Sequence, residues 1–304
     1  MTARIPAEAE LATLSTELRN GRSSAMDTMP VAEFLAVMNF EDQSVALAVR
    51  AAIPQIAEAA QQIATSLSTG GRLVYLGAGT SGRIGLLDAV ECPPTFGTDP
   101  EQILVLLAGG TQAFGVAAEG AEDSPDNAIV DIDEAGIGER DTVVGLAASG
   151  RTPYVIAGLD RAAERGAATV SVACNRQAAC SEHAQIAIEV DTGPEVLTGS
   201  TRLKAGTAQK LVCNMLSTAA MVQLGKTYQN LMIDMRPTNE KLVDRARRIV
   251  AEAAGVEVDV AAAALRSAGN RPKVATVMLL AGVSAAQAER RLATNNGFVA
   301  KAIG

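Results

Sequence analysis

Residues 73–83, LVYLGAGTSGR, decide the fold class of this chain. An uninterrupted apolar run, Leu73 to Leu76, leads into the glycine- and hydroxyl-rich segment 77–82, and a helical pattern begins at Arg83. Glycines let a ligand approach the backbone closely, and a helix start offers unpaired amides and the positive end of its dipole. We therefore expect a strand, an anion-binding loop and a helix at this point.

Four further apolar runs follow the first one along the chain. They cover residues 103–108, 143–148, 169–173 and 186–190. The runs are continuous rather than alternating, and segments of helical composition separate most of them, which is typical of parallel strands covered on both faces. The sequence predicts an α/β fold with a doubly wound, five-stranded parallel sheet. Ligands of such sheets bind at the carboxyl ends of the strands.

Helical patterns flank the predicted sheet. Residues 41–68 show apolar side chains at steps of three and four and predict one long amphipathic helix that Gly70–Gly71 ends. A second long helix is predicted from about Thr201 to Gly225, and the pattern is wholly helical from Asn239 onward, with Ser284 as an N-cap and a turn at Asn296–Gly297. We divide the chain into an N-terminal arm, an α/β domain and a C-terminal helical domain, with ranges 1–40, 41–238 and 239–304.

The composition limits the function classes. The chain has 34 acidic and 26 basic residues and a net charge of −8, so a general positive field for nucleic acid or anionic lipid is not expected. No apolar stretch approaches the length of a membrane span, and the start, MTARIPAEAELATLSTELRN, lacks the apolar centre of a signal peptide. We expect a cytoplasmic protein that binds no nucleic acid and no membrane.

Cysteine and histidine provide little chemistry here. The four cysteines have no C-x-x-C spacing, and Cys174, Cys180 and His183 do not match a zinc pattern, so we interpret the thiols as buried core residues. With a single histidine, His-based triads are not expected. We predict no metal and no cofactor, and we expect carboxylates to perform any acid and base chemistry.

Three hydroxyl clusters follow predicted strands. They hold the candidate phosphate-binding residues Thr80, Ser81, Ser149, Thr152 and Ser200. Each cluster alone is more often a structural cap, but three in one sheet favour an anion site. The first matches G-x-G-x-x-G, yet no ribose-binding acid ends a strand about 20 residues later, and no G-x-x-x-x-G-K-[ST] is present. We favour a phosphomonoester ligand.

Two carboxylates are candidates for catalysis. Glu91 lies in AVECPPTFG, after a short helix that starts at the first loop, and its mostly apolar neighbours suggest burial and a raised pKa suited to a proton donor. Glu122 follows the second strand at the same sheet edge. Spacing alone does not separate Glu122 from its neighbours Glu119 and Asp123.

Several longer strings carry a family resemblance. They are GAGTSGR at 77–83, DAVECPPTFG at 88–97, AAEGAED at 117–123, AASGRTPYV at 147–155 and GPEVLTGSTRLKAGTAQK at 193–210. With these strings the sequence closely resembles the bacterial N-acetylmuramic acid 6-phosphate etherases. It is also similar to the wider group of sugar isomerase (SIS) domains, which includes the glucokinase regulatory protein. The resemblance runs from TELRN at 16–20 to the helical tail, whose residues 271–304 resemble small ubiquitin-associated-like ends.

The resemblance implies a function and residue roles. It implies a lyase that removes D-lactate from carbon 3 of N-acetylmuramic acid 6-phosphate and leaves N-acetylglucosamine 6-phosphate, in recycling of cell-wall sugars by cytoplasmic homodimers without a metal. The family's proton donor matches Glu91, and its second active-site acid matches Glu122. Lys204, with Arg202, is expected to contact the phosphate or the lactyl carboxylate, or else to be a solvated helix residue.

Two other function classes remain open from the sequence. A sugar-phosphate-binding regulator would keep the hydroxyl loops and perform no chemistry, but a longer chain with a second SIS-like half would be expected. An aldose-ketose phosphate isomerase would share the fold and the loops, but it moves protons between carbons 1 and 2 without breaking an ether.

Overall fold

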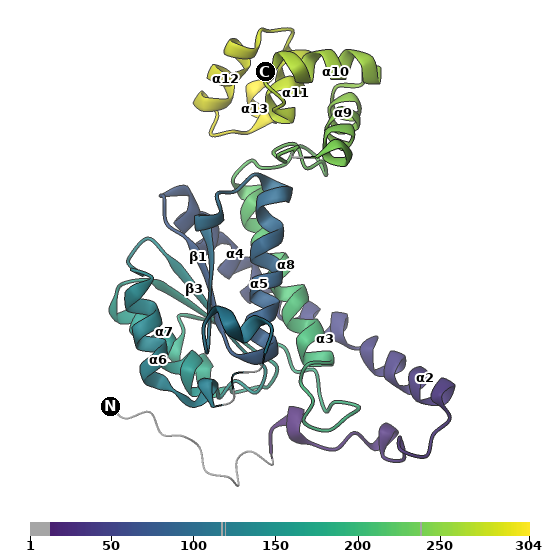
Figure 1. The fold of residues 1–304 in the computed structure, drawn as a ribbon, viewed down its shortest axis with the longest axis vertical. Coiled ribbons are helices and arrows are strands. Elements are labelled where there is room, and N and C mark those ends of the chain that lie inside the picture. Colours follow the sequence, from purple (N-terminus) through teal and green to yellow (C-terminus); the bar gives the residue numbers. More distant parts are fainter. Residues whose placement is uncertain (1–12, 117, 119, 238) are drawn as a thin grey trace. The chain divides into compact units, whose positions relative to one another are not determined.

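A central sheet organises the first part of the molecule (Figure 1). The computed structural model describes residues 13–116, 118, 120–237 and 239–304. Its five strands are all parallel, in the order β2-β1-β3-β4-β5. They are β1 Leu73–Gly77, β2 Ile103–Leu107, β3 Thr142–Ala147, β4 Ala168–Ala173 and β5 Ile186–Glu189. All five strand predictions are confirmed to within one residue at each end.

Helices cover both faces of this sheet, which confirms the doubly wound α/β fold. Helices α6 (Pro125–Glu134) and α7 (Pro153–Glu164) pack together on one face, where α7 contacts β1, β3 and β4. Helix α4 (Ile53–Ser68) contacts β1, β3 and β5, and Figure 1 shows it on the opposite side of the sheet from α6 and α7. Because both faces are covered, every residue of β1 and β3 is buried, and the strands are continuous apolar runs.

The N-terminal part is a series of short helices, and the prediction of one helix over residues 41–68 is wrong. The structure has three helices there: α2 (Val31–Asp42), α3 (Val45–Ala51) and α4. Pro54 lies in the first turn of α4, where its missing N–H costs nothing, but a proline disfavours helical backbone in the residue before it. The apolar face recognised in the sequence belongs to α4 alone, with Ile56, Ile63 and Leu67 buried.

Two long helices follow strands β1 and β5. Helix α5 spans Gly79–Phe96 and helix α8 spans Lys204–Gln223. Instead of ending before Glu91, α5 continues to Phe96, with Pro93 and Pro94 in its last turn. The predicted start of α5 at Arg83 is also wrong, because the helix begins at Gly79.

Contacts divide the chain into two compact units. The first comprises residues 1–88 and 103–216, and the second comprises residues 89–102 and 217–304. Five helices follow in the second unit: α9 Glu240–Ala254, α10 Val258–Ser267, α11 Pro272–Ala281, α12 Ala285–Thr294 and α13 Val299–Ala302. Ser284 caps α12 in a capping box, and residues 295–297 form a turn, as predicted. The domain boundaries after residues 40 and 238 remain predictions.

Candidate functional site

The first hydroxyl loop lies at the carboxyl end of β1. A Cβ at Gly77 would approach the Gly82 nitrogen to 2.8 Å, and a Cβ at Gly82 would approach the Gly77 oxygen to 2.8 Å, so both positions need glycine for the first turn of α5 to pack on the strand end. Thr80 and Ser81 belong to this first turn and not to a loop before it. Their hydroxyls are therefore fixed beside the amides of a helix N-terminus.

The Ser81 side chain is held in place by Gln209, which was not predicted as a site residue. The Ser81 Oγ donates to Oε1 of Gln209 on α8 at 2.9 Å, and both side chains are buried. The Nε2 of Gln209, a residue only 1% exposed, has no hydrogen-bond partner among the described residues. Gln209 lies in the GSTRLKAGTAQK string, which was the only sequence signal for it.

The second hydroxyl loop lies beside the first, because β1 and β3 are neighbours in the sheet. Gly77 at the end of β1 is paired with Leu146 near the end of β3, from which the chain continues into Ser149–Thr152. Pro153 opens α7, as predicted, with Thr152 at the N-cap, whose hydroxyl does not cap the helix. The backbone N–H of Arg151 donates to the Ser149 Oγ at 3.3 Å.

These two loops occupy the switch point of the sheet. In the order 2-1-3-4-5 the chain changes direction between β1 and β3, and the crevice there is where doubly wound sheets bind ligands. The structure thus brings Thr80 and Ser81 to the same edge as Ser149 and Thr152. Helix starts with hydroxyl side chains suit a phosphate group.

The third hydroxyl cluster is arranged differently. Helix α8 begins at Lys204, so Ser200 precedes it by four residues. The carboxylate of Glu195 accepts from the backbone N–H groups of Lys204 and Ala205, both at 3.0 Å. Glu195 is fully buried, and this burial raises its pKa above the usual range although the two amides oppose the rise. Two amides at the start of α8 are therefore already occupied by a carboxylate, and the role of Ser200 remains a prediction.

Lys204 is buried in an ion pair, and its contact with the substrate remains a prediction. Its side chain is 2% exposed, and its Nζ donates to Oε2 of Glu41 on α2 at 2.8 Å. Arg22 adds a second cation to the same carboxylate at 3.3 Å. Burial opposes ionisation of Glu41, but the hydrogen bond and charge of Lys204 outweigh it, so the pKa of Glu41 is lowered. In the structure, the ion pair between the Lys204 ammonium and Glu41 links α8 to α2.

Glu91 is exposed, which corrects the expectation of burial. Cys92 and Phe96 are buried, but they share the other face of α5 with Asp88 and Ala89. Glu91 lies with Leu87, Val90 and Pro94 on the exposed face, as helical steps of three and four require. Along α5 it is ten residues beyond Ser81, which corresponds to about 15 Å at the helical rise.

Glu122 lies in the segment between β2 and α6. It belongs to the 3-10 helix Ala121–Asp123 and is exposed. A Cβ at Gly109, two residues after β2, would touch Ala121 and Ala118, so this segment folds back onto the end of the strand. Arg83 on α5 also donates to the carbonyl oxygens of Ala113 and Phe114, at 2.7 and 3.2 Å. Asp123 is exposed as well, and the rival Glu119 lies outside the described residues.

The thiols and the histidine lie in structural positions. All four cysteines are buried and free, and burial raises the pKa of the Cys180 thiol to about 12, so it is unsuited to nucleophilic or metal chemistry. His183 Nδ1 lies 2.7 Å from Asp160 Oδ1. Within the described ranges no group of three or more His, Cys, Asp or Glu side chains could hold a metal ion.

Comparison with known proteins decides the family. Residues 55–163 match the family model of the glucokinase regulatory protein N-terminal SIS domain, and residues 125–219 match the SIS domain. A protein of Mycolicibacterium smegmatis named N-acetylmuramic acid 6-phosphate etherase is 61% identical over 97% of this chain and 99% of its own. The chain belongs to the N-acetylmuramic acid 6-phosphate etherase family.

Further members of the etherase family match over similar lengths. N-acetylmuramic acid 6-phosphate etherase 2 of Lactiplantibacillus plantarum is 56% identical, over 95% of this chain and 98% of its own. Among solved structures, a phosphoheptose isomerase from Neisseria gonorrhoeae has a TM-score of 0.49 and 17% identity, over 62% of this chain and 98% of its own. Among the helices that the structure describes in this chain, none is long and apolar enough to cross a membrane.

Proposed function

We propose that this chain is a carbon–oxygen lyase that cleaves the D-lactyl ether of N-acetylmuramic acid 6-phosphate by elimination followed by addition of water. The products are N-acetylglucosamine 6-phosphate and D-lactate, as in the catabolism of cell-wall amino sugars in the cytoplasm. Identity of 61% over nearly the full length to a protein named for this activity carries the proposal. The paired hydroxyl loops at the switch point support it, because they suit the 6-phosphate.

The chemistry requires an acid, a base and an open sugar ring. An ether oxygen is a poor leaving group, but an aldehyde at carbon 1 acidifies the hydrogen at carbon 2 and makes elimination of the group at carbon 3 feasible. In this proposal Glu122 removes the proton from carbon 2, and Glu91 protonates the departing lactate oxygen. Glu91 then takes a proton from water as the water oxygen adds to carbon 3, and Glu122 returns a proton to carbon 2. Carbon 3 now carries a hydroxyl, and both carboxyl groups are in their initial states.

The substrate phosphate is assigned to the two adjacent loops. Thr80, Ser149 and Thr152 can donate hydroxyl hydrogen bonds, and Ser81 can do so when its hydroxyl hydrogen turns from Gln209 to the phosphate. The first turns of α5 and α7 add backbone N–H groups. The bound anion needs no basic surface, which is consistent with the net charge of −8. Metals and cofactors have no step in this scheme.

Glu91 is assigned to the active site of a second copy of the chain. Glu91 lies ten residues beyond Ser81 on α5 and on the exposed face of the helix, where a second copy of the chain can reach it. Around Glu91, Leu87 and Val90 are exposed apolar side chains. In a homodimer this face of α5 would be covered, and Glu91 would gain the apolar surroundings of a proton donor.

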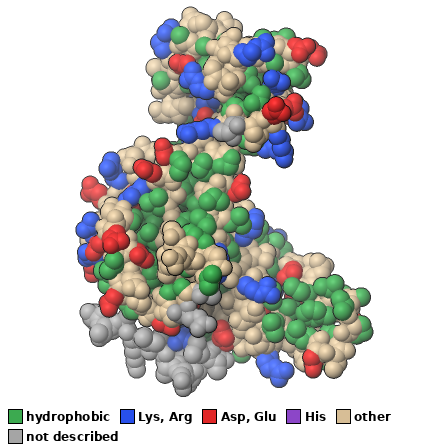
Figure 2. All heavy atoms as spheres, in the orientation of Figure 1, with side chains coloured by type: hydrophobic (Ala, Val, Ile, Leu, Met, Phe, Trp, Pro, Cys, Tyr) green, Lys and Arg blue, Asp and Glu red, His purple; other side chains and the backbone are tan. Residues whose placement is uncertain are grey.

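The surface of the first unit supports a homodimer independently. Hydrophobic side chains gather over α2 (Figure 2), where Val31, Leu35 and Phe40 are exposed and no residue of the helix is buried. Monomeric proteins rarely expose large apolar patches of this kind. A second copy is the proposed partner of this surface.

Mixed dimers of two inactive variants test the function and the shared site together. Glu91→Gln removes the proton donor from an exposed position, and Thr152→Asp repels the phosphate while keeping a favoured N-cap for α7, so both variants should fold. In a mixed dimer one site carries both changes and the other carries neither. Release of D-lactate by an equimolar, re-associated mixture should therefore recover to about a quarter of the wild-type rate.

The outcomes of this experiment separate the two parts of the proposal. Wild-type protein that releases no D-lactate contradicts the function itself. Active wild-type protein with two inactive variants whose mixture stays inactive contradicts the shared site alone. Retained activity of Thr152→Asp would place the phosphate elsewhere.

A further inference from the structure

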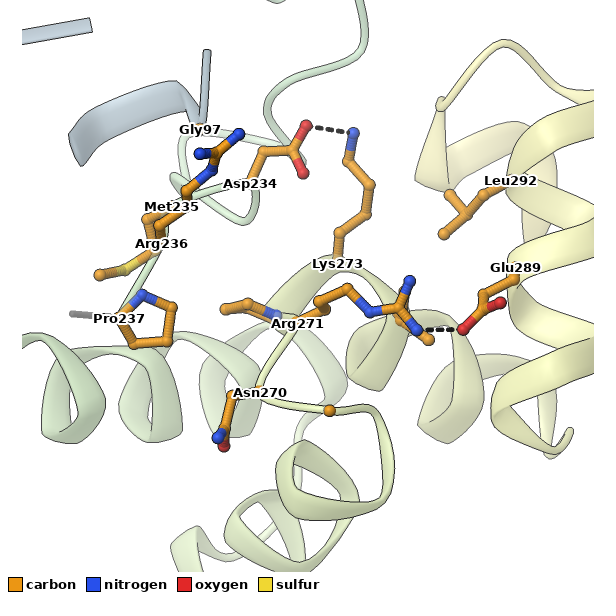
Figure 3. A pocket seen from close by; sticks show the side chains of 13 residues that line it. Gly97, Asp234, Met235, Arg236, Pro237, Asn270, Arg271, Lys273, Glu289 and Leu292 are labelled. Carbon is orange, nitrogen blue, oxygen red and sulfur yellow. Dashed lines mark hydrogen bonds and ion pairs between the residues drawn. The ribbon is translucent and has the colours of Figure 1, made fainter. Parts of the chain in front are cut away.

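The second compact unit contains a cavity that shares no residue with the hydroxyl loops. Its volume is about 700 Å³, which is within the usual range for small-molecule sites (Figure 3). Its lining comes from the end of α5, the segment before α9, the first turn of α11 and one face of α12. The lining residues are Gly97, Asp234, Met235, Arg236, Pro237, Gly269, Asn270, Arg271, Pro272, Lys273, Val274, Glu289 and Leu292.

Basic side chains outnumber acidic ones around this cavity. Asp234 Oδ2 is shared by two ammonium groups, Lys273 at 2.6 Å and Lys226 at 3.1 Å, so a single carboxylate faces two cations. Figure 3 shows Lys273 pointing toward Asp234, and Arg271 pairing with Glu289. These pairs leave one positive charge uncompensated.

Arg236 supplies a second uncompensated charge. It lines the cavity, is exposed, and has no ion-pair partner among the described residues. The surplus of two positive charges contrasts with the net charge of −8 of the whole chain. Burial, together with the neighbouring Lys226 charge, lowers the pKa of Lys273, although Asp234 opposes this.

The backbone around the cavity is fixed by particular residues. Gly97 has φ +64°, and a Cβ there would overlap the Asp234 carbonyl oxygen, so only glycine lets the end of α5 support the Asp234 segment. Pro272 opens α11, and no side chain caps this helix start. The first-turn amides of Lys273 and Val274 therefore lie at the cavity without an intrahelical acceptor.

We propose that this cavity is a binding site for a small phosphate monoester. Two surplus positive charges match a phosphate dianion, and the guanidinium of Arg236 and the first-turn amides of α11 supply hydrogen-bond donors at the cavity. A phosphate fills only part of 700 Å³, and buried Met235, Val274 and Leu292 give the remainder an apolar wall for an organic group. The site is additional to the proposed etherase site, since its lining includes neither the hydroxyl loops nor Glu91 and Glu122.

Selective labelling of lysine allows the site to be observed directly in the full chain. The sequence has six lysines, at positions 204, 210, 226, 241, 273 and 301, so protein labelled with ¹⁵N-lysine gives six backbone amide signals. The Lys273 amide lies in the first turn of α11 at the cavity, whereas the Lys204 amide lies in the first unit. Inorganic phosphate and glycerol 3-phosphate should each shift the Lys273 signal in a saturable manner, and acetate at equal concentration should not.

A matched pair of variants completes the test. Arg236→Ala should weaken the Lys273 response about fivefold, as expected for loss of one partly exposed charge contact. Arg290→Ala, an exposed arginine of the same unit outside the cavity, removes the same charge and should leave the response unchanged. No saturable shift of Lys273, an equal response to acetate, or equal weakening by both variants overturns the proposal.

Discussion

The buried contact between Lys204 and Glu41 leads to the most specific prediction of the structure. Lys204→Met keeps most of the side-chain volume and removes the ammonium, which leaves Glu41 with Arg22 as its remaining ion-pair partner. The Arg22 side chain is 62% exposed, so it replaces little of the lost interaction. Helix α2 should then be held less firmly against the start of α8.

The size of the effect follows from the burial of the two partners. Removing one member of a fully buried pair costs about 3–5 kcal/mol, but Glu41 is 14% exposed and retains some solvation, so we expect about 2–3 kcal/mol here. The double variant Lys204→Met with Glu41→Leu leaves no unpaired charge. It should therefore be more stable than the sum of the two single changes predicts by about 1–2 kcal/mol.

Urea denaturation of the four proteins and steady-state kinetics together test this account. The free energy of unfolding should fall for Lys204→Met, and the KM for N-acetylmuramic acid 6-phosphate should change little under conditions where the variant is fully folded. If Lys204→Met unfolds like the wild type while KM rises tenfold or more, Lys204 contacts the substrate and the structural assignment is wrong.

The remaining predictions concern the acids, the phosphate loop and one glycine. Glu91→Gln should lower kcat for D-lactate release by at least about a hundredfold while exchange of the carbon 2 hydrogen with deuterated solvent persists; normal cleavage would exclude Glu91 as donor. Ser81→Ala should raise KM about five- to tenfold with little change in kcat, and unchanged saturation kinetics would contradict the phosphate assignment. The pKa of Glu41 is lowered in the folded state, so the stabilisation that the ionised carboxylate gives the fold is present above its unfolded pKa and is lost as pH falls through the folded value. Glu41→Gln should therefore flatten the dependence of the unfolding free energy on pH below about pH 4.5. An unchanged pH dependence would argue against the ion pair. Gly97→Ala should destabilise the protein by at least about 2–3 kcal/mol in thermal unfolding. The control Gly136→Ala should cost only about 1 kcal/mol, because Gly136 has φ +59° but an added Cβ there would meet no other atom. Equal losses would show that the close approach of Gly97 to the Asp234 carbonyl oxygen is unimportant.

The sheet was predictable from the sequence because burial on both faces gives each strand a local signature. Leu73–Leu76 and the four later runs are apolar at every step, and the glycines after the first run identify its carboxyl end. The switch-point loops follow from the same pattern, since carboxyl ends of parallel strands share one edge. The position of Ser81, Ser149 and Thr152 at this edge could therefore be predicted, and their contact with a phosphate remains a prediction.

Helix boundaries and side-chain partners were less accessible, because distant residues determine them. Pro54 marks the second of the two breaks in the expected helix over residues 41–68, whereas Pro93 and Pro94 did not stop α5. Lys204 pairs with a carboxylate 163 positions away. Glu91 has apolar neighbours in the sequence, but Cys92 and Phe96 lie on the buried face of α5 and Glu91 on the exposed face, and only the three-dimensional helix distinguishes the two faces.

The fate of the ether oxygen tests the proposed elimination and hydration most directly. Wild-type protein is incubated with N-acetylmuramic acid 6-phosphate in ¹⁸O-labelled water, and both products are analysed by mass spectrometry with fragmentation of the sugar. The account predicts unlabelled D-lactate and heavy oxygen at carbon 3 of N-acetylglucosamine 6-phosphate. Label in the lactate, or no release of lactate, would contradict it.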